Sequence, residues 1–319
     1  MGSNGHRRYT GQVRRGLVWA VAGGAAALAL TVAGWWFWRE REPLALFRHL
    51  PAENLLLLHL DVDALRRAPG LAPLAASGIA PDPDYAAFVR QTGFDYQRDL
   101  DQAAVCYLPD RVYVLARGRF QPDRLRQYAL AQGGSCAGGK LEQPCQMPAS
   151  RPDRRISFLL LSPRVLALAT APEPDAVRQL QSEPAVHAVP LARAVAARNP
   201  GALLWVTAAP APLGPALPSN LSLLGPVLAK AQRAHLFVND QSGSLRVVLE
   251  ADCASEPQAG ETRRLLQGVH DLIGGLLRGQ QPPNEWQRVL SSARIDQQGN
   301  TVRAAWTLDP ELLKRLRGP

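Results

Sequence analysis

The stretch LLLLHLDVD, residues 55–63, decides the fold class of this chain. Its first six residues are apolar except for His59, a pattern typical of a strand that is buried on both faces. Asp61 and Asp63 follow directly, and an Asp ahead of a helical stretch is a common N-terminal cap. The stretch therefore predicts a buried strand that leads straight into a capped helix.

The residues that follow alternate helical and strand patterns. Their order is a helix at 84–92, strands at 103–108 and 111–116, a helix at 122–131, strands at 156–161 and 165–170, and a helix from Pro172. Pro109-Asp110 and Ser162-Pro163 separate the paired strands, because proline and aspartate favour turns. This first series covers residues 55–198.

A second series repeats that order over residues 199–319. It predicts a strand at 202–207, a helical part at 221–234, strands at 235–239 and 245–251, a long helix, strands at 293–296 and 302–307, and a helix from Asp309. In the long helix seven apolar residues share one face, which we expect in the core: Leu265, Leu266, Val269, Leu272, Ile273, Leu276 and Leu277. The prediction is an α+β body of two tandem related units, each a strand, helix, two strands, helix, two strands and helix, with largely antiparallel sheets.

Ahead of the body, residues 16–38 read GLVWAVAGGAAALALTVAGWWFW, without a charge. A helix of that length spans about 34 Å, enough to cross a bilayer. The expected organisation is a cytoplasmic tail at 1–15, one transmembrane helix at 16–38, a juxtamembrane linker at 39–54, and the two repeats at 55–198 and 199–319.

Charge around this segment predicts its orientation. Four arginines precede it, Arg7, Arg8, Arg14 and Arg15, whereas residues 39–42 carry two Arg and two Glu that cancel. This bias keeps the N-terminus in the cytoplasm and places the body across a bacterial inner membrane, in the periplasm.

Four aromatic residues argue that the helix is retained as an anchor. Aromatic rings prefer the headgroup level, so these residues would form an interfacial belt: Trp35, Trp36, Phe37 and Trp38. The alternative is a signal peptide cleaved after Thr31-Val32-Ala33. The segment also offers a helix-packing face of small residues four apart, Ala20 with Gly24 and Gly23 with Ala27.

If the body is extracytoplasmic, its compartment permits disulfides, and the four cysteines fit this chemistry better than a metal site. Cys136 and Cys145 flank a glycine-rich loop of eight residues, and we expect a disulfide between them. Cys106 and Cys253 fit buried free thiols, with a second bridge as the alternative. Since no CxxC spacing occurs and no histidine lies near a cysteine in the sequence, we expect no metal and no cofactor.

No local motif predicts catalysis. The histidines are dispersed, and the sequence has no HExxH, GxSxG, SxxK or glycine-rich phosphate loop. Three acidic pairs, Asp61/Asp63, Asp82/Asp84 and Asp99/Asp101, could share a proton or hold a hard cation. Helix caps and turns explain the same spacing better.

Net charge does not favour a polyanion partner. Of the formal +9, residues 1–42 carry +4 and the body carries +5. Nucleic acid would lie on the other side of the membrane, so we expect none as a partner.

Several short stretches resemble a known group of sequences. They are Leu50-Pro51-Ala52-Glu53-Asn54 before the apolar strand and Asp61-Val62-Asp63, 92–96 (TGFDY) with 98–101 (RDLD), and Gly118-Arg119-Phe120. Together, behind one membrane helix, they resemble uncharacterised bacterial single-pass envelope proteins of acidobacterial type, known as a domain of unknown function. The resemblance implies only that this architecture recurs.

Two function classes remain. The first is a membrane-anchored, non-catalytic interaction or scaffold protein, an accessory subunit whose partners are the lipid bilayer and another envelope protein. The second is an envelope enzyme whose site is assembled from dispersed residues between the two repeats, which would need a polar cleft with shifted pKa values. The sequence does not predict the oligomeric state.

Overall fold

The computed structural model describes residues 44–69, 83–139, 142–209, 230–278 and 292–308. The predicted membrane helix, its aromatic belt, its small-residue face and Asp82 lie outside these residues. Among the helices that are described, none combines the length and apolarity needed to span a bilayer. The described residues from Leu46 onward form one compact unit.

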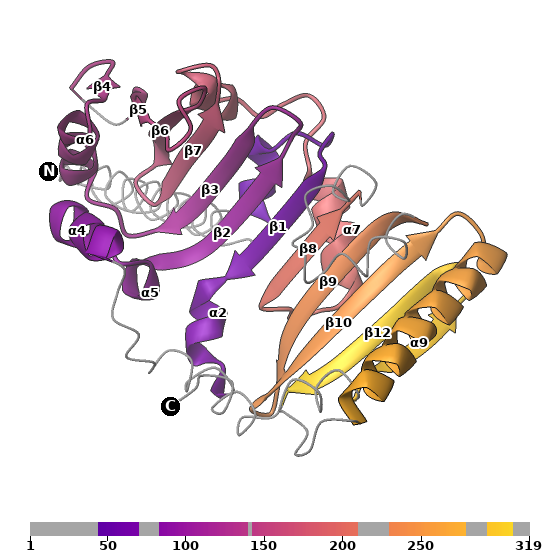
Figure 1. Cartoon of the computed structure of the whole chain (residues 1–319). Helices are drawn as coiled ribbons and strands as arrows, with labels where there is room; N and C mark the ends of the chain where they lie inside the picture. The colour runs from indigo at the N-terminus through magenta and orange to yellow at the C-terminus, as the bar shows by residue number, and fades with distance from the viewer. Residues whose placement is uncertain (1–43, 70–82, 140–141, 210–229, 279–291, 309–319) are drawn as a thin grey trace, which may run out of the picture. The chain divides into compact units, whose positions relative to one another are not determined.

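One large antiparallel sheet organises this unit (Figure 1). Its strands are β1 (Leu56–Asp61), β2 (Leu100–Tyr107), β3 (Val112–Gly118), β4 (Ser135–Cys136), β5 (Cys145–Pro148), β6 (Arg155–Ser162), β7 (Val165–Ala171), β8 (Leu204–Ala208), β9 (Ala231–Gln241), β10 (Ser244–Cys253), β11 (Arg294–Gln298) and β12 (Thr301–Leu308). The α-helices are α2 (Val62–Arg67), α4 (Pro83–Thr92), α5 (Tyr96–Asp99), α6 (Pro122–Ala131), α7 (Val189–Arg198) and α9 (Glu256–Arg278), and the 3-10 helices are η1 (Ala45–His49) and η3 (Ala176–Leu180). The predicted α+β class with a mainly antiparallel sheet is confirmed.

The strand order is the same in the two halves of the sheet. The order β1-β2-β3-β7-β6 in the first half corresponds to β8-β9-β10-β12-β11 in the second. β1 and β8 pair antiparallel at the centre, so the twelve strands form one continuous sheet. β5 and β4 extend the first half beyond β6.

The stretch 55–63 forms the predicted strand and capped helix, but only one face of the strand is fully buried, because Leu57 and His59 are buried and Leu58 is half-buried. β1 lies in the middle of the sheet, where Leu58 is paired with Val105 on one side and Val206 on the other. Asp61 caps α2, because its carboxylate accepts a hydrogen bond from the backbone N–H of Ala64 at 2.8 Å. A cap of this kind stabilises a helix by about 1 kcal/mol.

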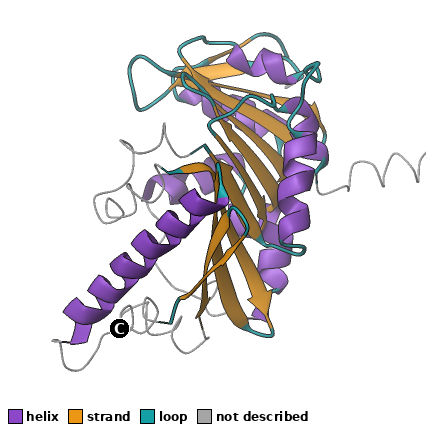
Figure 2. Cartoon of the chain, turned by 90° about the vertical axis from the view of Figure 1, so that its right-hand side faces the viewer, coloured by secondary structure: helices purple, strands orange, loops and turns teal. Residues whose placement is uncertain are grey.

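Helices cover both faces of the sheet (Figure 2). On one face, called here the α9 face, α6 packs Leu125 and Ala129 against Phe158, and α9 packs Leu266 against Val302. On the other, the α7 face, η1 stacks Phe47 on Trp205 with ring centroids 5.2 Å apart, and η3 and α7 lie on the same side. The core therefore consists of two apolar layers, one on each side of the sheet.

The disulfide prediction is confirmed. Cys136 and Cys145 are directly paired residues of the β4–β5 hairpin and are bonded to each other. Cys106 and Cys253 are buried free thiols, and burial raises the pKa of the Cys106 thiol to about 12. The Cys253 thiol lies 3.5 Å from the hydroxyl of Thr262 in α9.

The long C-terminal helix corrects one prediction. Leu266 is buried, but Leu265 and Leu272 are 40% and 55% exposed, so the whole predicted face is not core. α9 contacts β10, β11 and β12 through its first part, where the small Ala259 and Thr262 are fully buried, and its last turns lean away from the sheet (Figure 2). Helical periodicity shows which residues share a face, but not how far along the helix a neighbouring layer extends.

Two further boundaries differ from expectation. The structure places residues 231–234, predicted as helix, in β9, because Ala231 and Ala234 pair with Cys253 and Ala251 of β10. The helix expected from Pro172 is a short 3-10 turn, η3. In both places a long-range contact to the sheet outweighs a local helical preference.

Candidate functional site

A cluster of charged side chains lies on the α7 face of the second half of the sheet. β10 places Glu250 and Asp252 on this face, because residues two apart in a strand point to the same side. Their cross-strand neighbours are His235 of β9 beside Glu250, and Arg303 and Thr301 of β12 beside Glu250 and Asp252. The alternation of β10 therefore brings two carboxylates, two cationic or titratable groups and a hydroxyl together.

Arg198, the last residue of α7, connects this helix to both carboxylates. Its Nε donates to Glu250 at 2.8 Å, and its two Nη atoms donate to the two oxygens of Asp252 at 2.7 and 2.8 Å. A bidentate arginine–carboxylate pair is both strong and directional. Burial disfavours the charged guanidinium, but these hydrogen bonds outweigh it and raise the pKa of Arg198.

Asp252 is the most strongly held carboxylate of the cluster. In addition to the hydrogen bonds from Arg198, Asp252 accepts one from the Thr301 hydroxyl at 2.8 Å and is hydrogen-bonded to Nε2 of His235 at 3.1 Å. Burial alone would raise the pKa of Asp252, but the hydrogen bonds from His235, Arg198 and Thr301 lower it well below its usual value. Asp252 is therefore a fixed anion at neutral pH rather than a proton carrier.

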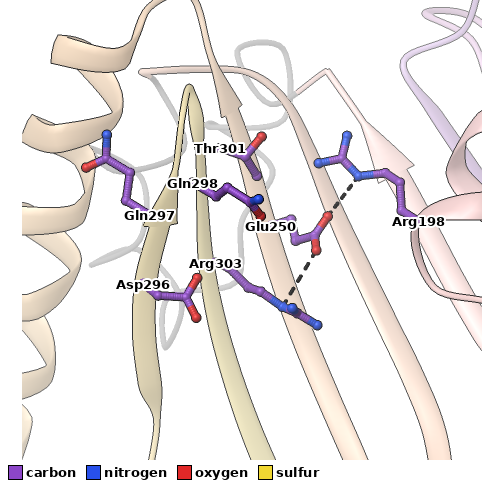
Figure 3. A pocket seen from close by; sticks show the side chains of 7 residues that line it. All are labelled: Arg198, Glu250, Asp296, Gln297, Gln298, Thr301 and Arg303. Carbon is purple, nitrogen blue, oxygen red and sulfur yellow. Dashed lines mark hydrogen bonds and ion pairs between the residues drawn. The ribbon is translucent and has the colours of Figure 1, made fainter.

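An open pocket of about 550 Å³ borders the cluster (Figure 3). Its lining residues are Arg198, Glu250, Asp296, Gln297, Gln298, Thr301 and Arg303. Arg303 lies 3.7 Å from Glu250, an ion-pair distance that is too long for a hydrogen bond. The pocket walls thus combine both charge signs with two amides and a hydroxyl, groups that recognise polar ligands.

Two atoms near the pocket have no hydrogen-bond partner in the described part of the chain. They are Nδ1 of His235, whose side chain is 3% exposed, and Nε of Arg303. Buried polar atoms usually have a hydrogen-bond partner, so these two atoms are unsatisfied polar groups of the cluster. The His235 ring is stacked on the Phe237 ring, with the ring centroids 6.1 Å apart.

His59 is a second buried histidine on the same face, and it plays a packing role. Its ring stacks on Trp205 at 5.6 Å, and neither nitrogen has a hydrogen-bond partner among the described residues. Burial lowers its pKa to about 4, so the ring is neutral at physiological pH. His235 is therefore a hydrogen-bonded sheet histidine, whereas His59 is held by ring stacking.

Of the acidic pairs, Asp63 and Asp101 share a partner in the described residues, Arg66, which lies 3.4 Å from each. Asp61 caps α2, while Asp63 pairs with Arg66 at 3.4 Å and Arg67 at 2.9 Å. Asp101 pairs with Arg164 at 2.6 Å. In the residues that the structure describes, no group of three histidine, cysteine or acidic side chains has an arrangement that could hold a metal ion.

Asp99 has a structural role in the turn around α5. It is 6% exposed, and it accepts hydrogen bonds from Arg98 at 2.7 Å and from the backbone N–H of Asp95 at 3.0 Å. The Arg98 hydrogen bond is the main cause that lowers the pKa of Asp99 to about 2. Arg119, which follows β3, also lies 3.3 Å from Asp99, so this carboxylate connects the turn to the end of β3.

The sequence interpretation did not identify the Arg198 cluster. Its only local signal is the stretch VVLEADC, residues 247–253, in which Glu250 and Asp252 interrupt an otherwise apolar run and lie two residues apart, on the same face of the strand. Two acidic residues on one face of a buried strand are expected to have basic partners, since buried charges are normally paired. Arg198 is 52 residues upstream of Glu250, so its identity as the partner required the fold.

Comparisons with known proteins do not assign a function. No protein-family model matches the sequence and no curated protein matches it significantly, so the resemblance to envelope proteins stays a prediction. Solved structures described as crystal forms III and I of TP0453 are similar at 9% and 8% identity, with TM-scores of 0.46 and 0.45. Each covers 85% of this chain, which in turn covers 96% and 95% of theirs. Similarity of this degree carries no argument about function.

Proposed function

We propose that this chain is a membrane-tethered, extracytoplasmic interaction protein that acts without catalysis, as an accessory subunit of an envelope complex. The observation that carries the proposal is the pairing of charges beside the pocket. Arg198 is bonded to both Glu250 and Asp252, and Asp252 is also bonded to His235 and Thr301. A cluster whose ionised groups are tied to one another presents a rigid polar surface, which suits recognition better than proton transfer.

The tether and the compartment rest on the sequence together with the disulfide. The uncharged segment at 16–38 and the preceding arginines favour an anchor with the body outside the cytoplasm. The Cys136–Cys145 bond agrees with an oxidising compartment. The partners would be the bilayer and another envelope protein.

We also infer that the body arose from two tandem related units. Support comes from the matching strand orders β1-β2-β3-β7-β6 and β8-β9-β10-β12-β11. It also comes from the helix that each half inserts after its third strand, α6 and α9. A duplicated sheet of this kind offers a long surface on which different components can bind.

An envelope enzyme is the second candidate, and His235 is the observation that favours it. Asp252 orients the His235 ring in the way that a carboxylate orients a catalytic histidine. However, the imidazole is almost fully buried, and His235 is not among the residues that line the pocket. A general base must reach its substrate within hydrogen-bond distance, so this geometry favours a structural role.

The topology can be tested with one exposed cysteine. Ser182 is exposed and is not among the residues that line the pocket, so Ser182→Cys in the full chain should react with a membrane-impermeant maleimide in intact spheroplasts. Labelling only after lysis would place the body in the cytoplasm and overturn the proposal.

The interaction role needs a second measurement. A photo-reactive amino acid at Gln298, on the pocket rim, should form an adduct with another envelope protein in native membranes. The same group at Ser182 is the matched control, and Arg198→Ala should reduce the Gln298 adduct because it disorders the pocket wall. Equal adduct formation at both positions, or none at Gln298, would contradict the proposal.

A further inference from the structure

β11 forms the outer edge of the second half of the sheet. In the part of the chain that the structure describes, β11 pairs with β12 on one side and with no strand on the other. Its residues alternate between exposed and half-buried, with Arg294, Asp296 and Gln298 exposed. An unpaired edge of this kind offers backbone hydrogen-bonding groups to another strand.

The turn after β11 shows which backbone groups face outward. Gln298 pairs with Thr301 across the two-residue loop Gly299-Asn300, and Gly299 has a positive φ of 57°, as a type II′ turn requires. The residues that flank such a turn are hydrogen-bonded to each other, and hydrogen-bonded pairs alternate along an antiparallel ladder. Asp296 and Arg294 therefore bond to β12, and the N–H and C=O groups of Ile295 and Gln297 point away from the sheet.

A second copy of β11 fits this edge in one register. With Ile295 opposite Ile295 of the second copy, the outward backbone groups of both strands meet. Arg294 of each copy then lies opposite Asp296 of the other, in non-hydrogen-bonded pairs, where Cα atoms are only about 4.5 Å apart. Opposite charges at such positions stabilise strand pairing.

The neighbouring registers are disfavoured by the same charges. Centring the pair on residue 294 places Arg294 opposite Arg294, and centring it on residue 296 places Asp296 opposite Asp296. Like charges directly opposite each other destabilise a ladder. Charged edge strands often deter pairing. Here, however, Arg294 and Asp296 are two residues apart, so two antiparallel copies of β11 place opposite charges next to each other.

We propose that two copies of this chain form a two-fold dimer through antiparallel pairing of β11, which joins their sheets into one. The inference deepens the proposed function, because it names a second copy of this chain as one partner of the interaction protein. The two-fold axis is perpendicular to the sheet, so both α7 faces lie on the same side. Arg294 of the second copy then stands beside Asp296, a residue that lines the pocket. The pocket wall is completed by the partner.

The helix above this edge adds apolar surface. α9 contacts β11 and β12, and it exposes Leu265 and Leu272, which are seven residues apart. In the two-fold arrangement both copies of α9 lie on the same side of the joined sheet. Burial of these two leucines at the dimer interface would remove their apolar surface from water and so stabilise the dimer.

Cross-linking tests the register directly. Two differently tagged full-length chains, one with Arg294→Cys and one with Asp296→Cys, are co-expressed and oxidised mildly in native membranes. The proposed register places these cysteines within the Cα separation that a disulfide allows, about 4.4–6.8 Å, and leaves the other Arg–Asp pair intact. A chain with Gln298→Cys, co-expressed with Arg294→Cys, is the matched control. That pair is offset by two residues and should give at least tenfold less cross-link.

Charge reversal tests the energetic reason. In the purified full chain, Asp296→Arg places two arginine pairs across the axis and should weaken dimerisation at least about tenfold by analytical ultracentrifugation. The double variant Arg294→Asp/Asp296→Arg restores the complementarity and should return dimerisation to within about threefold of the starting protein. Circular dichroism melting checks that both variants are folded, as expected for exposed side chains.

The outcomes separate this inference from the proposed function. No cross-link between positions 294 and 296, equal cross-linking in the control, or failure of the double variant to restore dimerisation would overturn the dimer. None of these results changes maleimide labelling at Ser182 or adduct formation with a different envelope protein.

Discussion

Replacing Arg198 by Ala should destabilise the protein more than any other single arginine substitution on α7. Glu250 is only 8% exposed, and both it and Asp252 would lose their closest cation. Removing one partner of a buried ion pair costs about 3–5 kcal/mol, and the 30% exposure of the Arg198 side chain reduces the expected loss to about 2–3 kcal/mol.

Thermal unfolding of the full chain in detergent, followed by circular dichroism, measures this loss. For a protein of this size about 2–3 kcal/mol corresponds to a decrease in Tm of roughly 4–12 °C. Arg193→Ala is the matched control, because Arg193 is an exposed residue of the same helix, and it should change stability by less than about 0.5 kcal/mol. Equal Tm values for the two variants would refute the reasoning.

The pH dependence of this difference provides a second check. The pKa of folded Asp252 is lowered, so the stability that it contributes is present above the unfolded pKa of about 3.9 and is lost as the pH falls further. The gap in Tm between the starting protein and Arg198→Ala should therefore be full at pH 6 and narrow below about pH 4. A gap that widens in acid would contradict the assigned role of Asp252.

Three further predictions follow from other parts of the fold. Replacing Cys136 and Cys145 together by Ser should lower the free energy of unfolding by about 2.5 kcal/mol on the chain-entropy model, measured as a lower Tm, and an unchanged Tm would show that the loop is held by other contacts. Leu266→Ala should cost about 2–4 kcal/mol whereas Leu272→Ala should cost less than about 0.5 kcal/mol, so similar losses in urea titration would contradict the observed burial of α9. Burial holds the pKa of His59 near 4, below its unfolded value of about 6.5, so the folded protein loses stability as the pH falls from 6.5 to 4. The decrease in Tm between pH 7 and pH 5 should therefore be smaller for His59→Phe than for the starting protein, and an equal decrease in both proteins would refute the prediction.

Most elements of the sheet could be located from local patterns. The paired strands at 103–108 and 111–116 correspond to β2 and β3, and the helix at 122–131 has the bounds of α6. The Cys136–Cys145 bond followed from a short glycine-rich loop that brings its ends together. These features depend on residues close together in the sequence, so apolar periodicity, turn residues and loop length carry enough information to predict them.

The sequence by itself determined the α+β class, the antiparallel pairs of strands that are neighbours in the sequence, and the disulfide, because each is set by local periodicity or a short loop. Only the tertiary structure decided that β1 and β8 pair to make one sheet, that Arg198 neutralises Glu250 and Asp252, and that Leu272 is exposed on α9. The physical reason is that burial and charge pairing are properties of contacts between distant segments. The energy of such contacts depends on which layer covers a residue, and a pattern along the chain does not contain that information.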